Sequence, residues 1–365
     1  MTPTAYINGK VFTGQSVETD KVVLTEGGQV LDVVAADAVP SRFEKEDLKG
    51  LQLSPALIDL QIYGGNEKMF SHELSEDSLE ATRQYCLAGG CSHFMITMAT
   101  NTLEKFLRGI ETVKSYWNNG GKGLLGLHLE GPYINPVKRG AHLENCIRKA
   151  GTEEVQGLLE RGKGVIKMIT IAPELCPPPV TDLLLKEDII VSAGHTNATY
   201  EEATSGFNKG IPAATHLYNA MSPLQHRAPG MVGAVLDHSA VMSSIVCDGI
   251  HVDYPALRIA KKVMGSRLFY ITDAVAEIKT GEYQHIFRSD RYTLPDGTLS
   301  GSALTMMQCV KNGMQHAGIS LEESLRMAST LPGQLLRHKK LGRIEKGYEA
   351  SLVAFDDDLQ VVKVY

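Results

Sequence analysis

The chain has 365 residues, of which 43% are hydrophobic and 21% charged, so it can bury a large core and its composition is not that of a disordered protein. The formal net charge of −6 argues against nucleic acid or an anionic membrane surface as a partner and favours a small molecule. The sequence contains no apolar run long enough to span a membrane and no N-terminal pattern of a secretory signal. The six cysteines form no C-x-x-C pair, which predicts reduced thiols in a cytoplasmic protein.

Both ends of the chain predict short antiparallel strands. Residues 4–53 alternate apolar and polar positions in short runs that are separated by glycines. Residues 351–355 and 359–365 repeat this pattern around a turn of three aspartates. Period-two patterning between turn residues is typical of a small sheet with one buried face. We therefore predict that residues 1–53 and 340–365 form one small β-sandwich domain.

Residues 54–339 predict a larger α/β domain, because short apolar bursts alternate with longer amphipathic stretches. The bursts span residues 55–61, 93–98, 123–130, 165–172, 189–194, 212–216, 243–247 and 268–273. Eight such units are the number that a closed (β/α)8 barrel of the TIM type requires. A doubly wound open sheet has the same rhythm, but no G-x-G-x-x-G follows the first strand of a βαβ unit, which counts against its dinucleotide-binding form. We predict the TIM-like barrel.

Polar side chains end several of the predicted strands, and in a barrel the catalytic groups gather at the C-terminal ends of the strands. The residues at these ends are Gln61, Tyr63, Glu130, His195, His216 and Asp273. A single buried histidine is as often a hydrogen-bonded core residue as a ligand. Two histidines and two carboxylates at equivalent strand ends favour a shared metal ion, because an uncompensated buried charge is costly.

Glu130, His195 and His216 are the predicted metal ligands. Two imidazole nitrogens and a carboxylate oxygen suit Zn²⁺, with Fe²⁺ or Co²⁺ as alternatives, and leave a position open for water. Such an ion lowers the pKa of bound water to about 7. Asp273 is then expected to move the proton, and its other roles by residue type are a fourth ligand or a helix cap.

Motifs along nearly the whole chain resemble those of the amidohydrolase superfamily. The similar segments are Pro55–Leu60, His128–Tyr133, Ser192–Thr196, Thr215–Met221, Asp248–Asp253, Leu299–Thr305 and Leu341–Gly347. Within the superfamily the chain is most similar to deacetylases that act on phosphorylated N-acetyl amino sugars. The resemblance implies a metal-dependent enzyme that cleaves the acetamide of N-acetylglucosamine 6-phosphate, giving glucosamine 6-phosphate and acetate.

The resemblance also implies roles for residues outside the strand ends. His142 matches the family histidine that hydrogen-bonds the carbonyl oxygen of the amide. Met307 would pack near the acetyl methyl group. In the family the phosphate-binding arginine reaches across from a neighbouring subunit, so a homodimer is expected. The phosphate-binding positions fall on Asn219, Ala220, Arg227 and His251.

Two segments depart from the family pattern. The superfamily ends its first strand with His-x-His, which helps to bind a second metal ion, whereas this chain has Gln61 and Tyr63. Because an amide and a phenol are poor zinc ligands beside imidazole, we predict one metal ion per chain. After Asp273 the family commonly has a loop with proline and glycine, whereas residues 274–278 read Ala-Val-Ala-Glu-Ile. The preference among N-acetylglucosamine, N-acetylgalactosamine and N-acetylmannosamine phosphates is therefore left open.

Two other functions compete with the deacetylase. Another amidohydrolase, acting on a cyclic amide or an amidine, usually needs the histidines of the first strand that this chain lacks. A barrel without activity that binds sugar phosphates would be expected to have lost at least one ligand residue or the proton-transferring Asp273, and all of them are present.

Overall fold

The structure is a computed structural model that describes residues 2–337 and 340–365. Contacts group the chain into two compact units, of which the second comprises Leu60–Tyr85 and Phe94–Leu304. The first holds the residues up to Asp59 together with Cys86–His93 and Thr305–Tyr365. The predicted domain bounds stay a prediction, and the bound at residue 339 lies outside the described residues.

The first unit contains two small sheets built from both ends of the chain. One has the order β5-β4-β1-β6 and the other β22-β21-β7-β2-β3. The C-terminal β21 pairs antiparallel with β7, so the two ends of the chain share a sheet. Tyr6, Val23 and Leu352 belong to one buried cluster that draws on both sheets, which confirms the predicted β-sandwich. The strands are β1 (Thr4–Ile7), β2 (Lys10–Phe12), β3 (Val17–Glu18), β4 (Lys21–Glu26), β5 (Gln29–Ala35), β6 (Glu44–Asp47), β7 (Gln52–Pro55), β21 (Leu352–Phe355) and β22 (Val361–Val364).

Eight parallel strands form the barrel, and they neighbour one another in chain order from β8 to β17. They are β8 (Leu57–Ile62), β11 (Cys91–Ala99), β12 (Leu124–Glu130), β13 (Ile166–Ile171), β14 (Ile190–Ala193), β15 (Ala213–Ala214), β16 (Met242–Val246) and β17 (Leu268–Ile271). The ends of the first and last strands meet, because the Asp273 N–H donates to the Gln61 carbonyl at 3.0 Å and the Tyr63 N–H donates to the Ala274 carbonyl at 2.9 Å. The predicted (β/α)8 barrel is confirmed.

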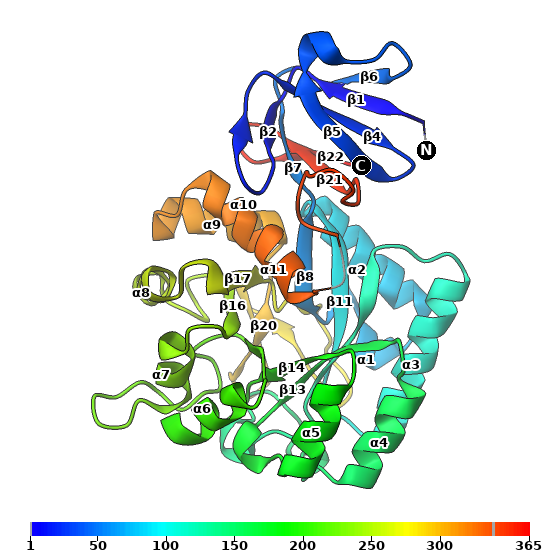
Figure 1. Cartoon of the computed structure of the whole chain (residues 1–365). Helices are drawn as coiled ribbons and strands as arrows, with labels where there is room; N and C mark the ends of the chain where they lie inside the picture. Colours follow the sequence, from blue (N-terminus) through cyan, green and yellow to red (C-terminus); the bar gives the residue numbers. More distant parts are fainter. Residues whose placement is uncertain (1, 338–339) are drawn as a thin grey trace. The chain divides into compact units, whose positions relative to one another are not determined.

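Helices follow most of the barrel strands, and α3, α4 and α5 lie along the outside of the strands in Figure 1. In α3, Phe106, Ile110 and Val113 recur at helical spacing and are buried, which gives the helix one apolar face. Within the described ranges no helix is both long and apolar enough to cross a bilayer. The helices are α2 (Glu76–Ala88), α3 (Leu103–Asn118), α4 (Thr152–Arg161), α5 (Pro178–Lys186), α6 (Tyr200–Asn208), α7 (Gly230–Asp237), α8 (Tyr254–Met264), α9 (Met306–Ala317), α10 (Leu321–Ala328) and α11 (Thr330–Leu335).

Two insertions follow the first and last barrel strands. After β8 come a short hairpin, β9 (Gly64–Gly65) with β10 (Lys68–Met69), and the one-turn helix α1 (Phe70–Glu73). After β17 comes an antiparallel sheet of β18 (Ile286–Phe287), β19 (Arg291–Thr293) and β20 (Leu299–Ser302). The Ser302 N–H donates to the Asp273 carbonyl at 2.8 Å, so this sheet is anchored beside the end of β17.

Candidate metal centre

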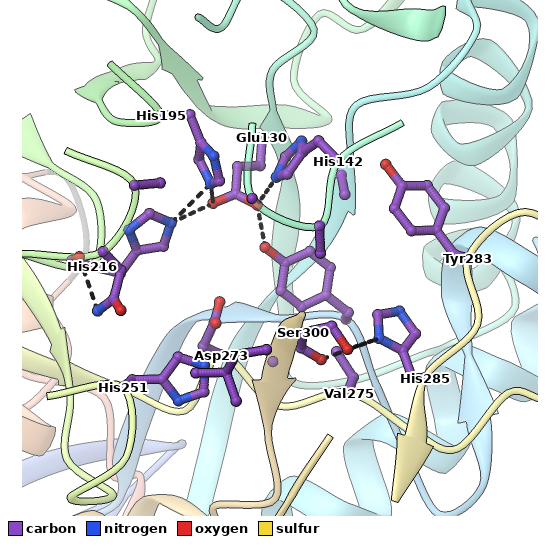
Figure 2. A pocket seen from close by; sticks show the side chains of 18 of the residues that line it. Glu130, His142, His195, His216, His251, Asp273, Val275, Tyr283, His285 and Ser300 are labelled. Carbon is purple, nitrogen blue, oxygen red and sulfur yellow. Dashed lines mark hydrogen bonds and ion pairs between the residues drawn. The ribbon is translucent and has the colours of Figure 1, made fainter. Parts of the chain in front are cut away.

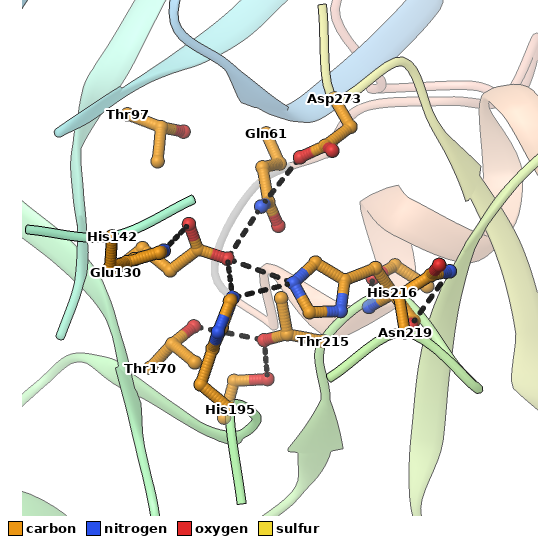
Figure 3. A network of polar contacts seen from close by, with 12 residues as sticks. Gln61, Thr97, Glu130, His142, Thr170, His195, Thr215, His216, Asn219 and Asp273 are labelled. Atoms are coloured by element: carbon orange, nitrogen blue, oxygen red, sulfur yellow. Dashed lines mark hydrogen bonds and ion pairs between the residues drawn. The ribbon is translucent and has the colours of Figure 1, made fainter. Parts of the chain in front are cut away.

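Three barrel strands bring one carboxylate and two imidazoles to one point. Glu130 is the last residue of β12, and His195 and His216 follow β14 and β15 within two residues. All three side chains are buried. Figure 3 shows the two imidazoles converging on the carboxylate. Glu130 Oε1 lies 3.4 Å from His195 Nε2 and 3.0 Å from His216 Nε2, and the two Nε2 atoms are 3.1 Å apart.

This spacing fits a single metal ion. Tetrahedral ligands at bond lengths of about 2.0–2.1 Å stand about 3.3 Å from one another, and the three separations scatter around that value. His195 Nδ1 lies 2.9 Å from the Lys138 carbonyl oxygen, which can only accept a hydrogen bond. Nδ1 therefore carries the proton and Nε2 keeps the lone pair that a metal ion needs. The donor set of Glu130, His195 and His216 could hold a borderline divalent ion.

The backbone is strained at the residues that point into this site. His195 has φ of +48°, His216 of +38° and Asp273 of +55°. A non-glycine residue in this left-handed region costs on the order of 1–3 kcal/mol, so surrounding structure must hold it there. At these positions the strand ends and the chain turns, which directs each side chain into the mouth of the barrel.

Further donors surround the Glu130 carboxylate. Gln61 Nε2 donates to Glu130 Oε1 at 2.9 Å, His142 Nε2 lies 3.0 Å from Glu130 Oε2, and the Tyr63 hydroxyl donates to the same Oε2. Burial alone would raise the pKa of Glu130, but the adjacent His195 and His142 outweigh it and hold the pKa well below its usual range. Gln61 and Tyr63 thus occupy the two first-strand positions as hydrogen-bond donors to the Glu130 carboxylate.

Asp273 lies beside this cluster with a perturbed pKa. Gln61 Nε2 donates to Asp273 Oδ1 at 2.9 Å, which fixes the carboxylate. Burial raises the pKa of Asp273, and the negative charge of Glu130 adds to the rise, while the neighbouring His216 opposes it. A carboxyl group whose pKa moves toward neutrality is better able to exchange protons at neutral pH.

The hydrogen bonds of His142 define which ring nitrogen carries its proton. The Thr100 backbone N–H donates to His142 Nδ1 at 3.2 Å, so Nδ1 is the acceptor and Nε2 carries the hydrogen. Burial, together with the nearby His195, lowers the pKa of His142 to about 4. The ring is therefore neutral at pH 7 and donates through Nε2 toward Glu130.

One pocket contains this cluster. Asn219, Ala220 and His251 also line it, so most of the predicted site residues share one cavity (Figure 2). His251 Nδ1 lies 2.6 Å from Asp248 Oδ2, and Asp248 Oδ1 accepts the backbone N–H groups of residues 250 and 251. Because the Asp248 carboxylate accepts the hydrogen bond from Nδ1–H, Nε2 of His251 is the ring nitrogen that remains for a ligand in the pocket.

The structure does not bring two of the predicted residues into this cavity. Arg227 is exposed in a tight turn between Gln225 and Ala228, and it does not line the pocket of its own chain. Met307 is a buried residue in α9 and belongs to the first unit. The roles of both residues stay predictions.

Several pocket residues were missed by the sequence reasoning. Tyr283, His285 and Ser300 line the cavity from the insertion that follows β17. The insertion has only short strands, so hydrophobic periodicity does not reveal which of its side chains turn inward. The Leu-Ser-Gly-Ser motif that contains Ser300 was the one signal that linked this insertion to the site.

Comparisons with known proteins agree with this geometry. Residues 53–365 match the amidohydrolase family model. The chain is 36% identical to N-acetylglucosamine-6-phosphate deacetylase of Haemophilus influenzae, over 98% of this chain and 96% of that protein. The crystal structure of N-acetylglucosamine-6-phosphate deacetylase from Pasteurella multocida aligns with a TM-score of 0.93 at 35% identity, covering 100% of this chain and 98% of that one. A mutant of the Mycobacterium smegmatis deacetylase, in complex with N-acetyl-D-glucosamine-6-phosphate, aligns with a TM-score of 0.91 at 26% identity, covering 100% of this chain and 98% of that one.

Proposed function

We infer that this chain, which belongs to the amidohydrolase family, is a metal-dependent amide hydrolase that deacetylates N-acetylglucosamine 6-phosphate. The products are glucosamine 6-phosphate and acetate. The observation that carries this inference is the convergence of Glu130, His195 and His216 beside Asp273 in one pocket. A divalent ion at this point supplies, when bound, a Lewis acid that activates water and polarises the amide carbonyl. We propose Zn²⁺, one ion per chain, because the donor set suits it and Gln61 and Tyr63 are poor ligands for a second ion.

Asp273 is the proposed proton carrier. It takes a proton from the attacking water and returns it to the amide nitrogen, which must leave as an amine because an amine anion is a very poor leaving group. Its raised pKa and its fixed position on Gln61 both suit this exchange. Proton return completes the bond cleavage, so one carboxylate serves as base and then as acid.

His142 is proposed to stabilise the charge that develops on the carbonyl oxygen of the substrate. Its ring is neutral at pH 7 and carries its hydrogen on Nε2, which faces the cluster, so Nε2–H can donate a hydrogen bond to the substrate oxygen. A donor that is already in place needs little reorganisation when the oxygen becomes negative. In this proposal Nε2–H turns from Glu130 to the substrate oxygen.

The phosphate is proposed to bind at Asn219, Ala220 and His251, which all line the pocket. Arg227 would complete this site from a second copy of the chain, since it is exposed and does not line the pocket of its own chain. The proposal therefore includes a homodimer. The six cysteines are all free and buried, which supports the proposed cytoplasmic location.

The direct test of this function is acetate release from N-acetylglucosamine 6-phosphate. Purified protein is expected to release acetate, to lose this activity after treatment with a chelator, and to regain it with added Zn²⁺. Metal analysis is expected to give one tightly bound ion per chain. Two tightly bound ions would exclude the one-metal site, and full activity in the chelated protein would exclude the metal-dependent mechanism.

Arg227→Ala is expected to weaken substrate binding through the phosphate. A charge-assisted hydrogen bond is worth about 1.5–3 kcal/mol, so KM for the phosphorylated sugar should rise roughly 10- to 100-fold. KM for unphosphorylated N-acetylglucosamine should change little. Arg161→Ala, at an exposed position at the end of α4, is the matched control and should leave both KM values unchanged. An equal rise of KM for both sugars would remove the phosphate role.

A further inference from the structure

His285 is a buried histidine of the pocket wall that the proposed mechanism does not use. It lies in the insertion after β17 and is 5% exposed. Its backbone N–H donates to the Ile278 carbonyl at 2.8 Å, and its carbonyl accepts the Ile278 N–H at 3.0 Å. The two bonds fix the backbone of His285 at the base of a hairpin. The side chain is therefore held in a defined place rather than on a free loop.

The contacts of the ring define its tautomer. His285 Nδ1 lies 3.1 Å from both the carbonyl oxygen and the hydroxyl of Ser300. Because a carbonyl can only accept, Nδ1 carries the proton and Nε2 has a lone pair. Burial lowers the pKa of His285 to about 4, so the ring is uncharged at pH 7. The ring also stacks on Tyr283 with 4° between the ring planes.

Nε2 is the ring nitrogen with no partner. Among the described residues only Nδ1 of His285 makes hydrogen bonds, and the side chain lines the same cavity as Asp273 and His142. When a ligand fills the pocket and displaces water, an acceptor that is left unpaired costs about 1–3 kcal/mol. The pocket thus offers a hydrogen-bond acceptor that a bound ligand can satisfy.

Figure 2 places His251 and His285 on opposite sides of the pocket, with Asp273 between them. In an amino-sugar 6-phosphate, the acetamide carbon C2 stands across the ring from C5, which carries the phosphorylated C6. A substrate with its phosphate at His251 and its acetamide near Asp273 therefore turns the C2 side of its ring, which is the edge farther from the phosphate, toward His285. The hydroxyl groups on that edge are those on C1 and C3, on either side of the acetamide.

We propose that His285 Nε2 accepts a hydrogen bond from the C1 or C3 hydroxyl of the substrate and thereby selects for a hydroxylated sugar ring. This inference rests on the proposed function and extends it to the sugar end of the pocket. A site with a buried acceptor disfavours an analogue that lacks the matching hydroxyl, because the acceptor is then left unpaired. Ser300 and Tyr283 act as positioning residues that hold the ring of His285.

Three variants separate substrate contact from a purely structural role. His285→Gln keeps an acceptor near the position of Nε2, His285→Asn keeps only a group near Nδ1 that can bond to Ser300, and His285→Phe keeps the ring alone. Each is assayed with N-acetylglucosamine 6-phosphate and with its 1-deoxy and 3-deoxy analogues. Metal content and thermal unfolding are measured for each protein, and His238→Gln, which does not line the pocket, is the control.

The wild type is expected to lose about tenfold in kcat/KM with one of the two deoxy analogues, as for the loss of one hydrogen bond. His285→Asn and His285→Phe should lose about tenfold with the full substrate and nothing further with that analogue, while His285→Gln keeps most of the activity. Equal kcat/KM for all three sugars in the wild type would overturn the proposal. So would wild-type behaviour of His285→Asn combined with loss in His285→Gln, because the ring would then only anchor Ser300.

Calorimetry can measure the affinity of Asp273→Asn protein for the same sugars, with and without the His285 substitutions. This comparison does not depend on turnover. Failure of the proposed function appears as absence of acetate release from any sugar by the wild type. Failure of the His285 proposal appears instead as equal affinity for the full and deoxy sugars. The two outcomes are therefore distinguishable.

Discussion

The Asp273→Asn protein is expected to keep its metal ion and its substrate affinity but to lose about a thousandfold in kcat. Positioned proton transfer contributes roughly 10²- to 10⁴-fold to catalysis, and an amide side chain cannot take up the proton. The substitution is nearly isosteric, and the amide oxygen of Asn can still accept the 2.9 Å hydrogen bond from Gln61 Nε2. The geometry is thus kept while the proton acceptor is removed. The measurements are steady-state kinetics and metal analysis on the same preparation.

Asp248→Asn is the informative contrast to this variant. Asp248 holds Nδ1 of His251 at 2.6 Å in the proposed phosphate site, so its loss should raise KM more than it lowers kcat. A KM effect from Asp248→Asn and a kcat effect from Asp273→Asn would separate binding from proton transfer. If Asp273→Asn kept most of the wild-type kcat with normal metal content, the proton would have to move through another group.

The barrel could be predicted because each strand carries its own local signal. Every apolar burst is short and overlaps one strand of the eight-stranded sheet. The candidate ligands followed from the same reasoning, since Glu130, His195 and His216 end or directly follow their strands. The barrel topology alone brings the ends of the parallel strands to one rim, so these residues could be predicted without contacts between distant parts of the sequence.

The remainder of the pocket depends on contacts between distant residues, which local patterns do not show. Tyr283 donates from its hydroxyl to the Thr100 carbonyl at 2.7 Å across 183 positions of sequence. His285, which precedes β18, is oriented by Ser300 in β20 of the same insertion. The sequence indicated that Tyr63 is a poor metal ligand. It could not indicate that the hydroxyl of Tyr63 donates to the carboxylate of Glu130.

Glu130→Gln is expected to abolish tight metal binding, and with it at least about a thousandfold of the activity. Each oxygen of the Glu130 carboxylate faces donors: Gln61 Nε2 is directed at Oε1, and the Tyr63 hydroxyl and His142 Nε2 at Oε2. An amide in either orientation would therefore turn its own N–H groups toward a donor, and the negative charge next to the ion would be gone. Residues that only support a metal ligand typically change affinity by about 10- to 100-fold. In Glu130→Gln the predicted ligand itself loses both its charge and its match to the surrounding donors, so the loss of metal affinity should exceed that range.

Competition with a coloured chelator measures this loss and ranks the neighbouring residues. Glu130→Gln should lose more than about a hundredfold in metal affinity, whereas Tyr63→Phe, which removes one donor to Glu130, should fall within about 10- to 100-fold. Glu160→Gln, at an exposed position on α4, should bind metal as the wild type does. Wild-type metal affinity in Glu130→Gln would mean that the ion is held elsewhere. An equal loss in Glu130→Gln and Tyr63→Phe would instead make the hydrogen-bond network around the carboxylate, rather than its charge, the main determinant of binding.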